Sequence, residues 1–357
     1  MPLTDEQRNA TTQMRAYITG APFPAGTAES VDQRARRPDP AHVPADVEVR
    51  VEIAPPSPHP FPLLDSSALK TPERVPVYFC TLRSEQAGSD TTDMRVIFFI
   101  HGGGNVADHP ADEPYIHLYA HILRAIATHS GGANRCVLIA PSYRLATIPE
   151  NTFPAALQDV VAAYDYVLSK GYNASNIVVA GASAGGNHGL SACSFICTRH
   201  RHHLTALVLT HLILQSGRPT PRGVITFAPA AIQAYDQLSE RAKANADADV
   251  VTVHVSEQCS SSYVGDTGVA RMDPLVSGVF IPFTTSWPKT LILIGSGDIL
   301  IDASRELEKR LSTLNLQVEL VEYEERPHMW FLMRVFSEDI QDAAARIARF
   351  AFGSSLA

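Results

Sequence analysis

The chain has 357 residues, of which 45% are hydrophobic and 18% are charged, and its formal net charge is -8. This composition supports a large hydrophobic core, and the length suits two average domains or one α/β domain with an added lid. Because the charge is moderate and no block of Lys and Arg stands out, we do not expect nucleic acid as a partner.

The N-terminal residues and the apolar runs indicate where the protein resides. Residues 1–8 are polar and lack the apolar centre of a signal peptide. The longest apolar runs, such as 204–214, have about ten residues and are too short to cross a bilayer. The five cysteines are widely spaced and form no C-x-x-C pair, which favours reduced thiols. We therefore expect a cytoplasmic protein without stable membrane insertion.

The first part of the chain combines a helix with a proline-rich stretch. Residues 5–18 are predicted to form a helix, and the prolines that follow disfavour long regular elements. Alternating apolar and polar residues over 47–53 predict a strand, and residues 75–82 predict a second one. Residues 1–45 are interpreted as an N-terminal cap element.

From Arg95 onward, predicted strands alternate with predicted helices. The strands are expected at 95–100, 135–140, 177–180, 223–227, 290–295 and 317–322. The helices are expected at 115–128, 154–170, directly after Ser183, 304–313 and 337–352. This alternation predicts a mostly parallel central sheet with helices on both faces. Residues 231–288 break the pattern and are interpreted as a lid insertion that divides the core into residues 46–230 and 289–357.

The stretch Gly181-Ala182-Ser183-Ala184-Gly185-Gly186 lies between a predicted strand and a predicted helix. A small-x-Ser-x-small motif at such a junction is typical of a nucleophile elbow, a sharp turn that presents the serine hydroxyl at its tip. Glycines beside the serine avoid a clash between strand and helix. The backbone N–H groups after the serine lie at a helix N-terminus, where they can hold negative charge. Ser183 is therefore a candidate nucleophile.

A second glycine-rich motif, His101-Gly102-Gly103-Gly104, follows directly on the predicted strand that ends at Ile100. Consecutive glycines let backbone N–H groups point into a cavity without steric cost. An oxyanion hole needs such donors, and each stabilises the transition state by about 3 kcal/mol. A plain glycine-rich turn is the alternative for this motif alone, but the downstream elbow favours an oxyanion loop.

A serine nucleophile needs a base within hydrogen-bond reach and a carboxylate that orients this base. The order expected for a strand–elbow–helix architecture is Ser, then Asp or Glu, then His. Asp298 follows one predicted strand and His328 follows the next one. Both are therefore expected at the same edge of the sheet as Ser183.

Other polar residues compete for these roles. Asp302 enters the next helix and is interpreted as a helix cap, whereas Asp266 and Asp273 lie in the predicted lid, away from a strand end. His188 lies inside the helix after Ser183 and is interpreted as a packing residue. Four histidines fall in or near one helix, but no carboxylate or cysteine pattern completes a metal site there: His109, His117, His121 and His129. We expect no metal and no cofactor.

Taken together, these motifs resemble the hormone-sensitive lipase family of α/β-hydrolases, over roughly residues 95–350. Further stretches are similar to family segments, namely Tyr143-Arg144-Leu145-Ala146, residues 153–159 and residues 273–277. The resemblance implies an α/β-hydrolase fold with a mostly parallel central sheet covered by helices on both faces and a helical lid or cap. It is also compatible with a homodimer.

The resemblance also implies roles for single residues. Ser183 would attack the acyl carbon, His328 would act as general base and acid, and Asp298 would orient His328. The oxyanion-hole amides would come from Gly103, Gly104 and Ala184. His101 would brace the oxyanion loop, and Arg144 and Asp159 would form a structural ion pair below the site.

The chain departs from the family pattern around the expected pocket. Ala182 stands where the family often has Asp, and 228–230 reads Ala-Pro-Ala where it often has Ser-Pro-Trp. Ser183 and the strand at Gly223 are about 40 residues apart, more than the family usually has. The N-terminal part is longer and richer in proline. Substrate specificity is therefore the property that transfers least.

The expected reaction is hydrolysis of carboxylic esters of small to medium apolar substrates through an acyl-enzyme on Ser183. The same triad could instead cleave lactones, amides or carbamates, or transfer or cyclise acyl groups. A ligand receptor on a hydrolase fold is a third alternative, which the complete triad disfavours. Apolar lid residues either line an acyl pocket or pack the lid onto the sheet: Ile232, Ala234, Tyr235, Tyr263, Val264, Phe280 and Phe283.

Overall fold

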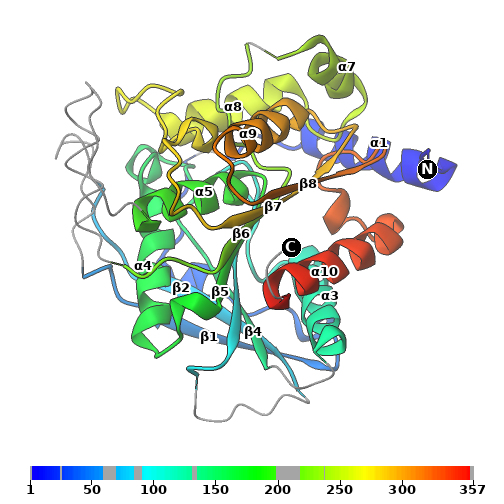
Figure 1. The fold of residues 1–357 in the computed structure, drawn as a ribbon. Coiled ribbons are helices and arrows are strands. Elements are labelled where there is room, and N and C mark those ends of the chain that lie inside the picture. The colour runs from blue at the N-terminus through cyan, green and yellow to red at the C-terminus, as the bar shows by residue number, and fades with distance from the viewer. Residues whose placement is uncertain are drawn as a thin grey trace.

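A computed structural model describes residues 2–24, 26–58, 70–83, 91–130, 135–197, 218–236 and 238–353. Its centre is an eight-stranded sheet with the order β1-β2-β4-β3-β5-β6-β7-β8 (Figure 1). The strands are β1 (Val47–Ala54), β2 (Val75–Leu82), β3 (Arg95–Ile100), β4 (Cys136–Pro141), β5 (Ile177–Ala182), β6 (Gly223–Phe227), β7 (Lys289–Gly295) and β8 (Val318–Tyr323). β2 pairs antiparallel with β1 and β4, and the pairs from β4 to β8 are parallel, which confirms the expected sheet.

The inner strands are buried on both faces, which explains their nearly continuous apolar sequences. In β3, Val96, Phe98 and Ile100 point to one hydrophobic cluster. The alternating residues Ile97 and Phe99 point to a second cluster on the opposite face. Two separate cores therefore flank one sheet, as the pleat of a strand requires.

Helices cover both faces of the sheet (Figure 1). One face carries α4 (Ala155–Ser169), α5 (Ala184–Cys197) and α9 (Ile301–Thr313), and the other carries α3 (Glu113–His129) and α10 (Ser337–Phe352). The predicted helices are confirmed within a few residues, although α9 begins one turn before the expected residue 304. Among the described helices, none is both long enough and apolar enough to cross a membrane.

The N-terminal part contains more helix than its prolines suggested. α1 (Asp5–Gly20) is confirmed, and Thr4 and Gln7 close its N-terminus with a capping box. A second, four-residue helix, α2 (Val31–Arg34), begins with another capping box formed by Ser30 and Gln33. Its single turn is too short to produce a hydrophobic periodicity, and the sequence analysis did not predict it.

Among its described residues, the segment interpreted as a lid contains two α-helices, one short 3-10 helix (Gly278–Phe280) and no strand. The α-helices are α7 (Glu240–Ala248) and α8 (Val253–Val264). Figure 1 places α1 next to α7, and the Arg15 guanidinium donates to the carbonyl of Ala246, at 2.8 Å. The proposed domain boundaries stay a prediction. The long connection between α5 and β6, residues 198–217, lies outside the described residues.

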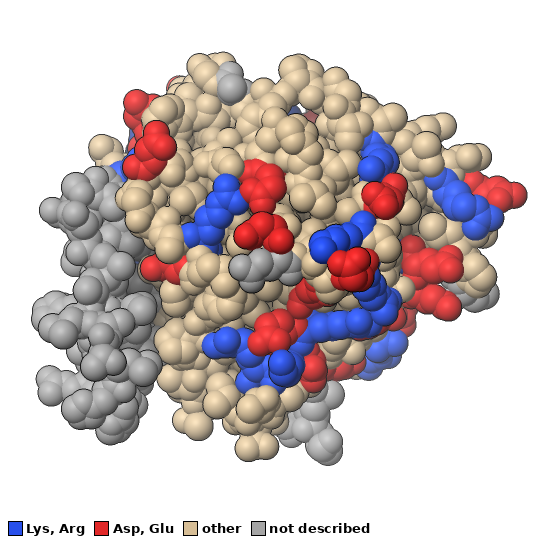
Figure 2. Space-filling model, turned by 90° about the horizontal axis from the view of Figure 1, so that it is seen from above, with Lys and Arg blue, Asp and Glu red and all other residues tan. Residues whose placement is uncertain are grey.

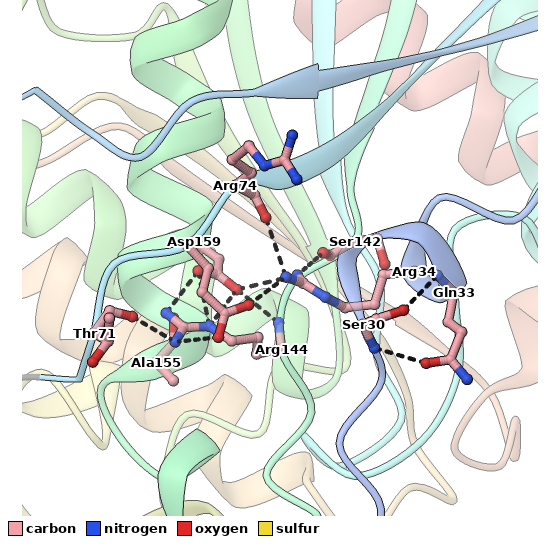
Figure 3. A network of polar contacts seen from close by, with 10 residues as sticks. Ser30, Gln33, Arg34, Thr71, Arg74, Ser142, Arg144, Ala155 and Asp159 are labelled. Carbon is pink, nitrogen blue, oxygen red and sulfur yellow. Dashed lines mark hydrogen bonds and ion pairs between the residues drawn. The ribbon is translucent and has the colours of Figure 1, made fainter.

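A buried ion-pair network joins the N-terminal part to α4. Arg144 Nη2 lies 2.8 Å from Asp159 Oδ1, and the side chains are 3% and 2% exposed, which confirms the expected structural pair. Arg34 Nη1 lies 3.4 Å from Asp159 Oδ2 and also donates to the carbonyl of Ser142. Figure 3 shows both guanidinium groups turned toward the one carboxylate. Arg34 therefore anchors α2 to the core.

Charged residues of both signs mix on the surface above the sheet. On the face in Figure 2, Lys and Arg lie beside Asp and Glu and do not gather into one basic patch. Binding to nucleic acid would need a concentrated basic surface, which this face does not have.

Candidate active site

Ser183 occupies the turn between β5, which ends at Ala182, and α5, which begins at Ala184. Its backbone φ is 53°, a left-handed value that non-glycine residues rarely adopt. The flanking glycines are required by close approach: a Cβ on Gly181 would lie 2.2 Å from the carbonyl oxygen of Gly185. A Cβ on Gly185 would lie 2.2 Å from the carbonyl oxygen of Ile100. The strained turn presents the hydroxyl group at the strand end, as an elbow does.

The structure brings the three expected triad residues together. His328 Nε2 lies 3.0 Å from Ser183 Oγ, and His328 Nδ1 lies 2.9 Å from Asp298 Oδ2. Asp298 follows β7 and His328 follows β8, so neighbouring parallel strands carry both residues to one edge of the sheet. His328 is 3% exposed and Asp298 is fully buried. A base with these two partners can take a proton from the serine hydroxyl.

The surroundings of His328 favour its protonated form. Burial alone would lower the pKa of His328, but the charge and hydrogen bond of Asp298 raise it, and Asp249 and Asp108 act in the same direction. The net effect is a raised pKa. An imidazolium that forms during a reaction would therefore be stabilised where it arises.

The oxyanion loop has the backbone that its glycines allow. Gly103 and Gly104 have φ values of 87° and 61°. Among the described residues, no acceptor takes the N–H groups of Gly103, Gly104 or Ala184. A Cβ at the neighbouring Gly102 would lie 3.3 Å from the Cβ of Ser183, so the loop touches the elbow. The role of these amides as oxyanion-hole donors stays a prediction.

Aromatic and polar side chains brace this loop from behind. The Tyr143 hydroxyl donates to the carbonyls of His101 and Gly102, at 3.0 and 2.8 Å. The His101 ring stacks on Tyr143 with centroids 4.2 Å apart, in line with the bracing role expected for it. His188 Nε2 lies 2.6 Å from Asn105 Oδ1, and burial lowers the pKa of His188 to about 3. His188 is thus a neutral packing residue, as predicted.

Asp108, an acidic residue beside the loop, was not predicted from the sequence. Asp108 has a φ of 66°, and its carboxylate accepts a hydrogen bond from the Tyr115 hydroxyl, at 2.9 Å. The Gly102 N–H donates to the same hydroxyl oxygen, at 2.8 Å. Burial raises the pKa of Asp108 to about 6. No spacing rule points to this residue, because its partner lies on α3.

Asp249 is a second residue that the sequence analysis missed. It follows α7, is 1% exposed, and its carboxylate accepts hydrogen bonds from the backbone N–H groups of His328 and Ile299. Rules based on strand ends select residues that follow a strand, and Asp249 lies in the lid segment instead. Its burial next to Asp298 and His328 is visible only in three dimensions.

The interpretation of Asp302 as a helix cap was wrong. α9 has no side-chain cap, and Asp302 lies in its first turn. The Asp302 carboxylate accepts hydrogen bonds from the Ser239 N–H and hydroxyl, at 2.9 and 2.8 Å. Asp302 therefore joins α9 to the start of α7, because the N-terminal end of α7 lies above this turn. Asp273 Oδ1 accepts from the Leu275 N–H within its own loop.

Part of the apolar lid set lines a small cavity whose wall includes Ile299 and Leu300, the two residues after Asp298. The cavity has a volume of about 130 Å³, and Ile232, Ala234, Tyr235 and Phe280 are among its lining residues. None of the three triad residues belongs to its lining. Within the described ranges, no group of three or more His, Cys, Asp and Glu residues could hold a metal ion.

Comparisons with known proteins agree with the fold. A family model described as the alpha/beta hydrolase fold matches residues 97–332. The chain therefore belongs to the alpha/beta hydrolase family. The expected fold class is thereby confirmed.

Two curated proteins and a solved structure are similar to this chain over most of its length. An acetyl-hydrolase of Streptomyces hygroscopicus is 27% identical over 72% of this chain and 74% of its own. An esterase of Acinetobacter venetianus is 24% identical over 77% and 80%. The crystal structure of an esterase from the bacterial hormone-sensitive lipase family superposes with a TM-score of 0.69, at 21% identity and 98% coverage of both chains. The last comparison confirms the expected resemblance at the level of the fold.

Proposed function

We propose that this protein is a serine hydrolase that cleaves carboxylic esters through an acyl-enzyme on Ser183. The observation that carries this proposal is the position of His328 between Ser183 Oγ and Asp298, with hydrogen-bond distances of 3.0 and 2.9 Å. The similarity to proteins named esterase and acetyl-hydrolase supports an ester as the substrate.

In the first half of the reaction, Ser183 Oγ attacks the acyl carbon while His328 Nε2 takes the hydroxyl proton. Asp298 accepts the hydrogen bond from His328 Nδ1 and stabilises the imidazolium. The N–H groups of Gly103, Gly104 and Ala184 donate to the oxygen on which negative charge develops. The intermediate then expels the alcohol, which receives its proton from His328 Nε2.

In the second half, His328 acts as base toward a water molecule. The water oxygen attacks the acyl carbon, and the same oxyanion donors hold the second intermediate. The carboxylic acid leaves, and Ser183 Oγ recovers its proton from His328. The proposal requires no metal ion and no cofactor.

Small to medium apolar esters suit the surroundings of the elbow. The Ser183 residue is only 9% exposed. A Cβ at Gly104 would lie 2.5 Å from Cys259 Sγ, so α8 of the proposed lid packs against the oxyanion loop. The room for an acyl group beside Ser183 is therefore small, which disfavours bulky substrates.

The test uses Ser183→Ala and an activated short-chain aryl ester. We expect kcat/KM to fall at least about a thousandfold, because the nucleophile is lost. A fluorophosphonate probe should label the wild type and fail to label this variant. Ser191→Ala is the matched control on the same helix, since the Ser191 hydroxyl donates to the Leu275 carbonyl and should leave labelling intact. Undiminished turnover by Ser183→Ala would exclude the proposal.

A further inference from the structure

Asp249 is the most completely bonded carboxylate near the candidate triad. Its Oδ1 accepts from the His328 N–H at 2.6 Å and from the Val250 N–H at 2.7 Å. Its Oδ2 accepts from the Ile299 N–H at 2.7 Å. Ile299 directly follows Asp298, so one side chain holds the backbones that carry both triad partners of Ser183.

We propose that Asp249 is a positioning residue through which the segment between α7 and α8 fixes Asp298 and His328 relative to each other. The proposal rests on the proposed function, since it assigns His328 and Asp298 as base and orienting acid. Asp249 is outside hydrogen-bond contact with the reacting serine, and it acts only through the two loops that it joins.

The loops after β7 and β8 need such a connection. The ladder between β7 and β8 ends at Gly295 and Tyr323, and beyond it the Ser296 and Gly297 N–H groups donate to the carbonyls of Tyr323 and Arg326. The last of these bonds, at Arg326, lies two residues before His328. His328 lies five residues beyond the ladder and Asp298 three residues beyond it. Catalytic geometry tolerates little displacement, and a shift of about 1 Å can cost a hundredfold in rate. Two further bonds from one buried carboxylate hold the loops next to the two functional residues themselves, at His328 and Ile299.

Burying a carboxylate at this place costs free energy, which indicates that Asp249 does more than fill space. It is 1% exposed and lies beside the charge of Asp298. Burial and that charge raise the pKa of Asp249, whereas His328 and the N–H bonds act in the opposite direction. An apolar residue would avoid this cost but would leave the His328 and Ile299 N–H groups without an acceptor.

The connection extends to the N-terminal helix. Arg15 of α1 donates to the backbone carbonyls of Ala246 and Asp249, at the C-terminal end of α7. Hydrogen bonds therefore run from α1 through Arg15 and Asp249 to His328. In this arrangement the proposed cap and lid segments help to position His328 and Asp298.

The main test is Asp249→Asn. An amide keeps the shape but offers one acceptor oxygen, so its NH2 group faces either the His328 or the Ile299 N–H. We expect kcat to fall about tenfold to a hundredfold while KM changes little. The negative charges that face His328 are Asp298, Asp249 and Asp108. Losing one of them should lower the pKa of His328, so the acid limb of the kcat/KM profile should move to lower pH.

A direct measurement separates positioning from general destabilisation. The 15N signals of the His328 ring, titrated with pH, report its pKa without any turnover. Asp302→Asn is the matched control, because it weakens the link at the other end of α7, and the Asp302 side chain bonds to Ser239 and not to Asp298 or His328. It should leave kcat, KM and the His328 titration unchanged.

Unchanged kcat in Asp249→Asn, or a loss of kcat with the His328 titration unmoved, overturns the inference. If Asp249→Asn does not fold, Arg15→Gln is the second test, because Arg15 bonds to the backbone carbonyl of Asp249 from α1. This substitution should lower kcat several-fold at constant KM. Unchanged kcat in that variant then overturns the inference. A fully active Ser183→Ala variant overturns the proposed function instead, so the two failures are distinguishable.

Discussion

Gly185 shows how closely α5 approaches the sheet. A Cβ there would lie 2.2 Å from the carbonyl oxygens of both Ile100 and His101, which are backbone atoms that cannot rotate away. We expect Gly185→Ala to lower the free energy of unfolding by about 3 kcal/mol or more, because strand and helix must separate. Urea unfolding followed by circular dichroism measures the effect.

Gly189, one turn further along α5, is the matched control. A Cβ there would lie 3.4 Å from Val179 Cγ1, which is an ordinary contact. Alanine in a helix interior is favoured over glycine by up to about 1 kcal/mol, so Gly189→Ala should be neutral or stabilising. Equal effects of the two substitutions would contradict the steric explanation.

Asp108 makes a specific contribution to the pH dependence of stability. Its pKa is raised to about 6 by burial, whereas an unfolded Asp titrates near about 3.9. Between these values the folded state binds more protons than the unfolded state. The contribution of Asp108 to the free energy of unfolding therefore falls as pH rises from 4 to 6 and is constant above this range.

Asn at position 108 cannot titrate. Relative to the wild type, Asp108→Asn should become more stable as the pH rises from 4 to 7, by up to about 2 kcal/mol. Denaturant unfolding of both proteins at the two pH values measures this double difference. The same stability difference at both pH values would refute the assignment.

At the scale of elements, Ser239 controls the start of α7. Its hydroxyl accepts from the Ala242 N–H and donates to Asp302 Oδ1, so one side chain caps the helix and ties it to α9. Ser239→Ala should destabilise α7 by about 1 kcal/mol. Hydrogen exchange should quicken over residues 240–248, while the global unfolding transition moves little.

Ser312→Ala provides the comparison for this prediction. Ser312 is an exposed residue of α9 whose hydroxyl donates to Glu308, without a role in capping. Exchange in α7 should be the same as in the wild type. If Ser239→Ala also leaves exchange in α7 unchanged, the capping bond has no effect on the stability of this helix.

Elements with a buried face could be predicted from the sequence. β2, β6 and α10 have the expected bounds, because a fully buried strand or a one-sided helix repeats its apolar residues regularly. α2, α7 and α8 could not be predicted: the first is a single turn, and the other two are mixtures of Ala, Ser and polar residues. Their positions depend on contacts with distant segments, which no local period encodes.

In the candidate site, too, some residues could be predicted from the sequence and others could not. Ser183, Asp298 and His328 could be predicted because each follows a strand whose end lies at one edge of the sheet. Asp249 and Asp108 could not, since neither follows a strand directly. Their positions depend on how α7 and α3 pack over the loops, and a buried carboxylate looks like a surface carboxylate in the sequence.

For the whole molecule, Asp159 balances two buried cations. Arg34 and Arg144 are 2% and 3% exposed in their side chains, and both contact its carboxylate. Asp159→Asn would leave these charges facing a neutral amide, with the half-exposed Glu73 as the remaining acid nearby. We expect a loss of about 3–5 kcal/mol in the free energy of unfolding.

A surface pair provides the contrast. Arg305 Nε lies 2.7 Å from Glu322 Oε1, and their side chains are 41% and 30% exposed. Glu322→Gln should lower the free energy of unfolding by less than about 1 kcal/mol, because water already screens this pair. Thermal unfolding of both variants checks the prediction, and similar losses would show that burial of the Asp159 network has no special weight.

The strand order has a consequence for synthesis on the ribosome. β8 is the last strand of the sheet both in space and in sequence, and His328 follows it. A nascent chain carries Ser183 well before the segment with its proposed base, His328, is translated, and domains complete their folding only as such segments emerge. Until β8 joins β7, the growing polypeptide lacks the proposed base, so we expect no acyl-enzyme to form on Ser183. The proposed hydrolysis thus begins only when the final strand is in place, so a partly synthesised chain should have no esterase activity.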